Sequence, residues 1–167
     1  MDSPVANNEK TYLCKIFINK RKMNRIIPIA SDHGGFEMKQ FLIGKLTDAG
    51  YEVHDFGTHS TDSVDYPDMI HPLATAISRG KFPLGIILCG SGNGAQMTAN
   101  HHTHVRAALC WNVELAKLAR QHNDANILAL PGRFISFDLA WEMVQAFLST
   151  DFEGGRHTRR VEKIEQF

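Results

Sequence analysis

Short apolar runs alternate along most of this chain with segments whose apolar residues recur every three or four positions. Short apolar runs are typical of strands buried on both faces of a sheet, and the longer period is typical of helices packed along one face. The pattern predicts five strands, at residues 26–31, 51–56, 84–88, 105–110 and 127–130. It predicts helices at residues 36–49, 67–78, 95–100, 113–121 and 137–148.

Local signals mark several of the predicted helix ends. Gly50 closes the first helix, Pro67 stands in the first turn of the second, and Asn112 can cap the helix that begins at residue 113. Five strands that alternate with helices predict an α/β fold. We expect a Rossmann-like three-layer sandwich, with a five-stranded parallel sheet between two layers of helices.

The two ends of the chain depart from this pattern. Residues 1–23 carry five basic and two acidic side chains. Lys15 interrupts their one apolar patch and no small-residue cleavage site follows, which argues against a signal peptide. We interpret residues 1–23 as a dispensable N-terminal extension and residues 24–167 as a single domain, whose charged tail from about residue 151 is expected to be helical.

Composition excludes several classes of function. The chain has 167 residues, of which 43% are hydrophobic and 22% charged, and its formal net charge is zero. That balance gives no electrostatic reason to expect binding to nucleic acid or to a membrane surface. No apolar run approaches the roughly 20 residues of a membrane span. Three cysteines, an odd and small number, argue against a disulfide framework and for the reducing cytoplasm.

The segment after the third predicted strand combines glycines with reactive side chains. Three glycines in five residues allow a tight turn that directs several backbone N–H groups to one point beside a helix N-terminus, an arrangement that binds anions. A thiol and a hydroxyl in the same turn place a candidate base or nucleophile next to a candidate oxyanion hole. The segment reads Cys89-Gly90-Ser91-Gly92-Asn93-Gly94.

More polar residues follow the first and fifth strands, at the carboxyl ends where parallel sheets bind ligands. Asp32 and His33 come after the first strand, and Arg133 comes after the fifth. Capping of the next helix is an alternative role for Asp32, but its position favours a place in the site. Tyr66, at the entry to a helix, is a candidate for lining the pocket.

Three further candidates lie near helix ends and in the tail. His122 ends a predicted helix, where a histidine either compensates the helix dipole or moves protons near neutral pH. Arg156 and Arg160 are four residues apart, so on a helix both guanidinium groups face one side and suit a phosphate dianion. A solvated basic face is the alternative for these two arginines.

The histidines at positions 101, 102 and 104 raise the question of a metal site. Three histidines in four residues of a loop rarely reach one ion, and no acidic residue or cysteine is spaced to help. We therefore expect a solvated loop here and no metal site. Cys14 lies in the extension, and Cys110 at a strand end is expected to be a small buried apolar residue.

Together these motifs resemble the type B ribose-5-phosphate isomerase family, which also contains galactose-6-phosphate isomerase subunits and members active on allose 6-phosphate. The resemblance runs from about residue 24 to near the C-terminus, in the family's order. The combination of the Cys89 loop with the His122 segment makes it specific. The matching segments are residues 31–35, 65–67, 89–94, 120–126, 132–133 and 154–157.

The resemblance implies an aldose–ketose isomerase that works through an enediolate without metal or cofactor. In such an enzyme His122 opens the sugar ring, and the Cys89 thiolate moves a proton between C1 and C2. Ser91 lies near the developing charge, and the backbone N–H groups of the loop hold the enediolate oxygens. The implied binding residues of the loop are Gly90, Ser91, Gly92, Asn93 and Gly94.

The resemblance also implies contacts with the rest of a sugar phosphate. Asp32 would contact sugar hydroxyls, and Asn123 would bind the sugar beside His122. Family members build this site between two subunits, with His122 supplied by the neighbour, so a homodimer or tetramer is expected. The residues expected to orient the substrate and its phosphate are His33, Arg133, Arg156 and Arg160.

Ribose 5-phosphate and ribulose 5-phosphate are the expected substrate pair, in the pentose phosphate pathway. One alternative is a six-carbon substrate such as galactose or allose 6-phosphate. A nucleophilic cysteine hydrolase would need a histidine within hydrogen-bond reach of Cys89 in the same subunit. A non-catalytic sugar-phosphate sensor would need neither Cys89 nor His122.

The N-terminal extension gives a first prediction. A protein that begins at Met23 should keep full isomerase activity and melt within a few degrees of the intact chain, because the extension is polar and basic. Steady-state rates and thermal unfolding of the two proteins test this. Aggregation or loss of activity in the shorter protein would show that the extension is part of the domain.

Overall fold

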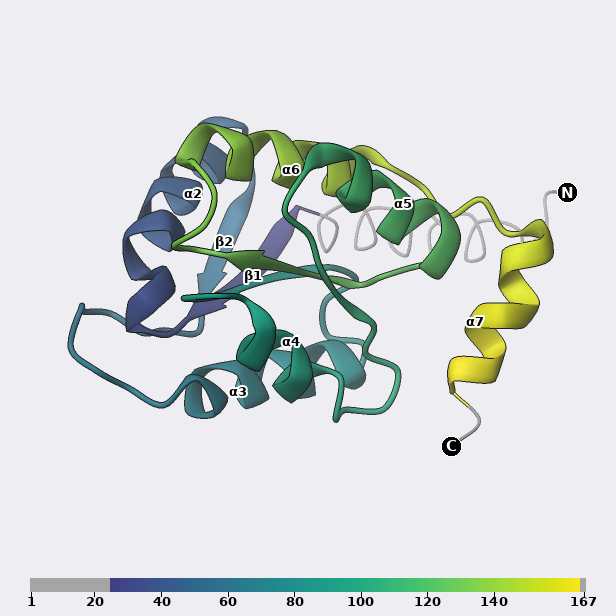
Figure 1. The fold of residues 1–167 in the computed structure, drawn as a ribbon, viewed down its shortest axis with the longest axis horizontal. Helices are drawn as coiled ribbons and strands as arrows, with labels where there is room; N and C mark the ends of the chain where they lie inside the picture. Colours follow the sequence, from purple (N-terminus) through teal and green to yellow (C-terminus); the bar gives the residue numbers. More distant parts are fainter. Residues whose placement is uncertain (1–24, 166–167) are drawn as a thin grey trace, which may run out of the picture.

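A computed structural model describes residues 25–165 (Figure 1). The N-terminal extension, with Cys14 and Met23, lies outside the described residues, so the interpretation of that segment stays a prediction. From residue 25 onward, strands and helices alternate as the hydrophobic pattern predicts. Among residues 25–165, no helix has the length and apolar character needed to cross a membrane.

The centre of the fold is a sheet of five parallel strands in the order β2-β1-β3-β5-β4. The predicted fold class is confirmed. β3 and β5 are buried along their whole length, which explains why their sequences read as unbroken apolar runs. The strands are β1 (Ile26–Ser31), β2 (Glu52–Asp55), β3 (Gly85–Cys89), β4 (Ala107–Leu109) and β5 (Ile127–Pro131).

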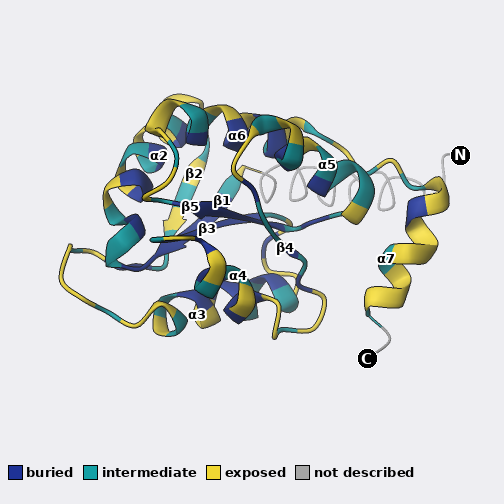
Figure 2. Cartoon of the chain, viewed as in Figure 1, coloured by how far each residue is buried: buried dark blue, intermediate teal, exposed yellow. Residues whose placement is uncertain are grey.

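Helices cover both faces of the sheet. The face covered by α2, α5 and α6 encloses one apolar core, and the face covered by α3 and α4 encloses another (Figures 1 and 2). The α-helices are α2 (Phe36–Asp48), α3 (Tyr66–Ser78), α4 (Asn93–Ala99), α5 (Val113–Asn123), α6 (Phe137–Ser149) and α7 (Thr158–Ile164). Two short 3-10 helices are η1 (His33–Gly35) and η2 (Gly155–His157).

The structure differs from the predicted elements mainly at their ends. The predicted strand 105–110 pairs only over Ala107–Leu109, at the edge of the sheet. Two backbone N–H groups at the start of this segment donate hydrogen bonds to side chains. The Asn126 Oδ1 accepts from the Arg106 N–H at 2.8 Å, and the Asn100 Oδ1 accepts from the Ala107 N–H at 2.7 Å. Both N–H groups are therefore satisfied by side chains at the edge of the sheet, where no further strand pairs with β4.

A buried ion pair joins α2 to the end of β2. The Lys39 side chain is fully buried, and its Nζ lies 2.5 and 2.6 Å from the two carboxylate oxygens of Asp55. Burial lowers the pKa of Lys39, and the Asp55 carboxylate opposes that shift. Asp55 also accepts a hydrogen bond from the Gly57 N–H at 2.8 Å. The pair therefore fixes the start of the loop that leads from β2 to α3.

Asp55→Asn should destabilise the protein strongly, because it leaves the Lys39 charge buried without a counter-ion. Breaking a buried pair in this way costs about 3–5 kcal/mol, which urea unfolding measures directly. Glu142→Gln on the exposed side of α6 is the control, with an expected change within about 0.5 kcal/mol. If the two substitutions cost the same, the pair contributes nothing to the fold.

Candidate active site

Three strand-end loops meet at the carboxyl edge of the sheet, beside the point where the strand order reverses between β1 and β3. The Asp32 N–H donates to the Leu88 carbonyl at 3.3 Å, which joins the first loop to β3. The Arg133 N–H donates to the Gly90 carbonyl at 3.0 Å, which joins the loops after β5 and β3. The structure thus brings the residues predicted after these strands to one edge.

Cys89 ends β3 with its side chain almost fully buried, at 4% exposure. The Gly92 N–H donates to the Cys89 Sγ at 3.1 Å. The backbone of Gly92 has a φ of +79°, and a Cβ there would collide with Leu109, so this turn requires glycine. A hydrogen bond directed at sulfur stabilises negative charge on it, which suits a cysteine that acts as a base.

The remaining groups of the loop stay open for a ligand. Ser91 is exposed, and its Oγ accepts long hydrogen bonds of 3.4 Å from Asn93. Among residues 25–165, the N–H groups of Gly90 and Ser91 have no acceptor. The Gly92 N–H is directed at the sulfur and the Asn93 N–H at the Ser91 Oγ, so the N–H groups that remain open at the start of the loop are those of Gly90 and Ser91.

Asp32 is buried, and one carboxylate oxygen caps the turn that follows β1. Its Oδ1 accepts from the Gly35 N–H at 3.1 Å, so the capping role considered from the sequence is present. A carboxylate has a second oxygen, so capping and ligand contact do not exclude one another. A role for Asp32 in the site stays a prediction.

His33 is oriented by the loop between β2 and α3. The Val64 N–H donates to the His33 Nδ1 at 3.3 Å. Nδ1 must then be unprotonated, which leaves the proton of the neutral ring on Nε2. Tyr66 begins α3 and packs its ring against Gly94, where a Cβ would lie 2.6 Å from the ring. The His33 ring therefore offers its Nε2–H as a hydrogen-bond donor. The Tyr66 ring forms one wall beside the Cys89 turn.

Four predicted site residues lie at the other end of the molecule. α5 runs antiparallel to the strands, so His122 and Asn123 at its end lie near the start of β5, not near Cys89 (Figure 1). The 11 residues of α5 make a helix about 16 Å long. Arg156 and Arg160 belong to the tail on this same side. One chain does not bring these residues to the Cys89 loop.

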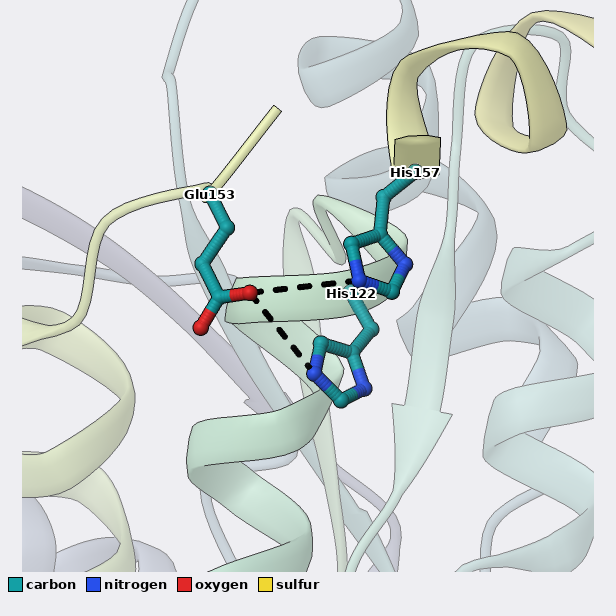
Figure 3. Close-up of side chains that lie close together, drawn as sticks. All are labelled: His122, Glu153 and His157. Atoms are coloured by element: carbon teal, nitrogen blue, oxygen red, sulfur yellow. Dashed lines mark ion pairs between the residues drawn. The ribbon is translucent and has the colours of Figure 1, made fainter. Parts of the chain in front are cut away.

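His122 lies in a cluster with two residues of the tail (Figure 3). Its ring stacks on the ring of His157, with centroids 4.3 Å apart and planes inclined by 7°. The Glu153 Oε2 lies 3.9 Å from the Nε2 of each ring. The Glu153 N–H donates to the Gln121 carbonyl at 3.0 Å, which fixes the tail to the end of α5.

Comparison with known proteins identifies the family. Residues 27–164 match the family model described as Ribose/Galactose Isomerase. The chain belongs to this family. Ribose-5-phosphate isomerase B of Escherichia coli K12 is 41% identical over 138 residues, which cover 83% of this chain and 93% of the relative. The predicted resemblance and the aldose–ketose isomerase class of the enzyme are confirmed.

Solved structures of relatives have the same fold. A ribose 5-phosphate isomerase from Thermotoga maritima is 48% identical, with a TM-score of 0.83 over 85% of this chain and 98% of the other. Ribose-5-phosphate isomerase B from Mycoplasma genitalium, solved with bound ribulose-5-phosphate, is 40% identical, with a TM-score of 0.81 over 84% of this chain and 94% of the other.

The cluster of His122, Glu153 and His157 in this isomerase has the composition of a metal site but not the geometry. Three donor atoms lie within 4.8 Å of one another. Stacked rings keep their nitrogen lone pairs in nearly parallel planes, so the two lone pairs do not converge on one ion. As arranged here, the three side chains do not form a metal site.

The surroundings of His157 disfavour its protonated form. Burial lowers the pKa of His157, the nearby His122, Arg156 and Arg160 lower it further, and Glu153 opposes them. The Arg156 Nε–H also donates to the His157 Nε2 at 3.5 Å, which requires an unprotonated nitrogen. The sequence predicts no role for His157 or Glu153, although His157 lies in one of the segments that match the family. Their contact with His122 exists only after the tail folds onto α5.

The tail of the isomerase is helical from Gly155 to Ile164, and its first turn is a 3-10 helix. Arg156 lies on η2 and Arg160 lies on α7. Glu165 at the end of α7 pairs with Arg106 at 2.6 Å and with His104 at 3.1 Å. The end of the tail is thus attached to the body of the domain, while Arg156 and Arg160 stay exposed.

The second described cysteine is chemically unlike Cys89. Cys110 is 1% exposed in an apolar core, and burial raises its pKa to about 12. It is the small buried residue that the sequence predicts. A thiol that stays protonated is a poor nucleophile and a poor base, so Cys110 is a suitable internal control for Cys89.

The Gly92 turn gives a prediction about the stability of this loop. Gly92→Ala should lower the free energy of unfolding by about 1–3 kcal/mol, because alanine disfavours a positive φ and its Cβ meets Leu109. At Gly90 a Cβ would only touch the Arg133 side chain at 3.5 Å, so Gly90→Ala should cost less than about 0.5 kcal/mol. Urea unfolding of both variants tests this, and equal costs would contradict the geometry of the turn.

Proposed function

We propose that this isomerase interconverts ribose 5-phosphate and ribulose 5-phosphate through an enediolate. The observation that carries the proposal is the Cys89 Sγ, held by the Gly92 N–H at 3.1 Å beside open backbone N–H groups at the sheet edge. The relatives support the substrate: one is named a ribose-5-phosphate isomerase, and another was solved with bound ribulose-5-phosphate.

The proton transfer uses the Cys89 loop. The Cys89 thiolate removes the proton on C2 of the open aldose, and the C1 carbonyl becomes an enediolate oxygen. The N–H groups of Gly90 and Ser91, with the Ser91 hydroxyl, stabilise the charge that develops there. The C2 hydroxyl proton passes to the C1 oxygen, Cys89 returns a proton to C1, and the C2 oxygen becomes the carbonyl of the ketose. The reaction moves hydrogen within one molecule and needs no external oxidant or reductant.

His122 opens the sugar ring before this step by moving a proton from the C1 hydroxyl to the ring oxygen. Asn123 binds beside it. Asp32 offers its second carboxylate oxygen to a sugar hydroxyl, and Tyr66, Asn93 and Gly94 line the sugar. The phosphate is held by the Nε2–H of His33 and by Arg133, Arg156 and Arg160, which suit a dianion.

The site is completed by a second copy of the chain. His122 and Cys89 lie at opposite ends of the sheet in one subunit, so His122 of the partner subunit must approach the Cys89 loop for both steps to occur on one sugar. This supports a homodimer, or a tetramer built from such dimers. The same copy would supply Arg156 and Arg160. The reaction belongs to the pentose phosphate pathway and to the cytoplasm.

Proton NMR in deuterium oxide tests the proposed reaction. With ribose 5-phosphate we expect ribulose 5-phosphate to form while solvent deuterium enters at the substrate carbon. Galactose 6-phosphate and allose 6-phosphate are the comparison substrates. Faster conversion of either would make this a six-carbon sugar-phosphate isomerase, and binding without exchange would make it a sensor.

Cys89→Ala should lower kcat by about 10²–10⁴-fold with the fold intact, the usual contribution of a positioned general base. Cys89→Ser should recover little, because a hydroxyl is a far weaker acid than a thiol. Cys110→Ala is the matched control and should keep kcat within about twofold, since Cys110 lies in the core. A near-normal kcat in Cys89→Ala would require another base.

Arg156→Ala and Arg160→Ala should raise KM strongly with a smaller effect on kcat, because phosphate binding is largely common to the ground and transition states. Arg159→Ala is the control, a neighbouring exposed arginine of α7 to which no role is assigned. An unchanged KM in both test variants would show that Arg156 and Arg160 do not bind the phosphate and form only a solvated basic face. A loss confined to kcat would place the tail in the chemical step.

A further inference from the structure

Two histidines from different elements face each other on the side of the domain covered by α3 and α4. His71 lies on α3, and His102 lies in the turn that follows α4. The His71 Nδ1 and the His102 Nε2 are 2.8 Å apart, and the ring centroids are 5.1 Å apart. Both nitrogens are therefore directed at the space between the rings. No metal site is expected from the sequence at residues 101–104, because no acidic residue or cysteine is spaced to help, but His71 from another element comes close to His102.

The contact between the two rings limits how many protons they can carry. A hydrogen bond between two imidazole nitrogens needs one donor and one acceptor, so the pair cannot be doubly protonated. Burial, together with the nearby His71 and His101, lowers the pKa of His102. Among residues 25–165, neither His71 nor His102 forms an ion pair. A neutral imidazole is the ligand that divalent metal ions require.

We propose that His71 and His102 bind one divalent late transition metal ion. At metal–nitrogen distances of about 2.0–2.1 Å, two ligands at a right angle are about 2.9 Å apart, close to the observed separation. Each ring must turn so that its lone pair points to one side of the line between the nitrogens. The rings are inclined by 57°, unlike the stacked rings of His122 and His157, and His71 is exposed.

The class of ion follows from the donors. Imidazole nitrogens favour Ni²⁺, Cu²⁺ and Zn²⁺ over Mg²⁺ and Ca²⁺, and right-angle geometry favours Ni²⁺ and Cu²⁺. Water completes the coordination, with His101 in the same turn as the nearest further imidazole. Binding requires that the His71 Nδ1 and the His102 Nε2 are both unprotonated, so the proton of their hydrogen bond must leave or move to another ring nitrogen. The ion would join α3 to the turn after α4, outside the isomerase site.

Calorimetric titration of the untagged full-length protein with NiCl₂ tests the proposal. We expect one ion per chain, and a thermal midpoint that rises with Ni²⁺ concentration, because an ion that binds only the folded state stabilises it. His71→Gln and His102→Gln should each weaken binding by about tenfold or more, since even the loss of groups that only orient ligands costs 10–100-fold. Neither readout depends on isomerase activity.

Two control variants separate this site from other groups. His104→Gln changes a histidine of the same loop that pairs with Glu165, and it should leave Ni²⁺ affinity unchanged. Glu153→Gln changes the cluster at His122 and should also leave it unchanged. The proposal is overturned if the parent protein binds no Ni²⁺, if His71→Gln binds as tightly as the parent, or if Glu153→Gln abolishes binding.

Discussion

Backbone contact between three loops at the carboxyl edge of the sheet determines the geometry of the Cys89 turn. A Cβ at Gly35 would lie 2.7 Å from the Cβ of Leu88, and one at Gly34 would lie 3.0 Å from the Gly90 nitrogen. A Cβ at Gly132 would lie 3.0 Å from the Gly35 Cα. Side chains at these positions would separate the loops, so the glycines are required for the strand ends to approach this closely. The hydrogen bond to the Cys89 sulfur depends on this packing.

The direction of the chain imposes the second constraint on function. Every strand of the sheet is parallel, so every connecting helix must run back, and α5 carries its last residues away from the edge that holds Cys89. The two ends of the molecule therefore carry different polar groups. One end offers a thiol and open N–H groups, and the other offers a histidine cluster and arginines. This division is the physical reason to propose that two subunits share each site.

The sequence predicts the layers of this fold because burial alone determines them. The unbroken apolar runs of β3 and β5 predict strands buried on both faces, and the helical period of α6 predicts a helix packed along one face. The start of β4 could not be predicted, because the side chains of Asn100 and Asn126 bind the backbone there. The Gly92 contact with Cys89 depends on one backbone angle that the residue types do not specify.

Contacts between segments that are far apart in the sequence could not be predicted from the hydrophobic pattern either. His71 and His102 are 31 residues apart, and their meeting depends on how α3 packs beside α4. The stacking of His122 on His157 depends on the path of the tail. In both cases the residue types suggested chemistry, but only tertiary packing decided which side chains could act together. The same limit applies to contacts between two subunits.

Subunit mixing tests the shared site most directly. Cys89→Ala and His122→Asn subunits, each close to inactive alone, are unfolded together and refolded as a mixture. If the site combines the two ends of different subunits, hybrid dimers contain one intact site, and the mixture regains up to about a quarter of the wild-type activity. If each chain contained a complete site, every site in the mixture would carry a lesion, and activity would stay at the level of the separate variants.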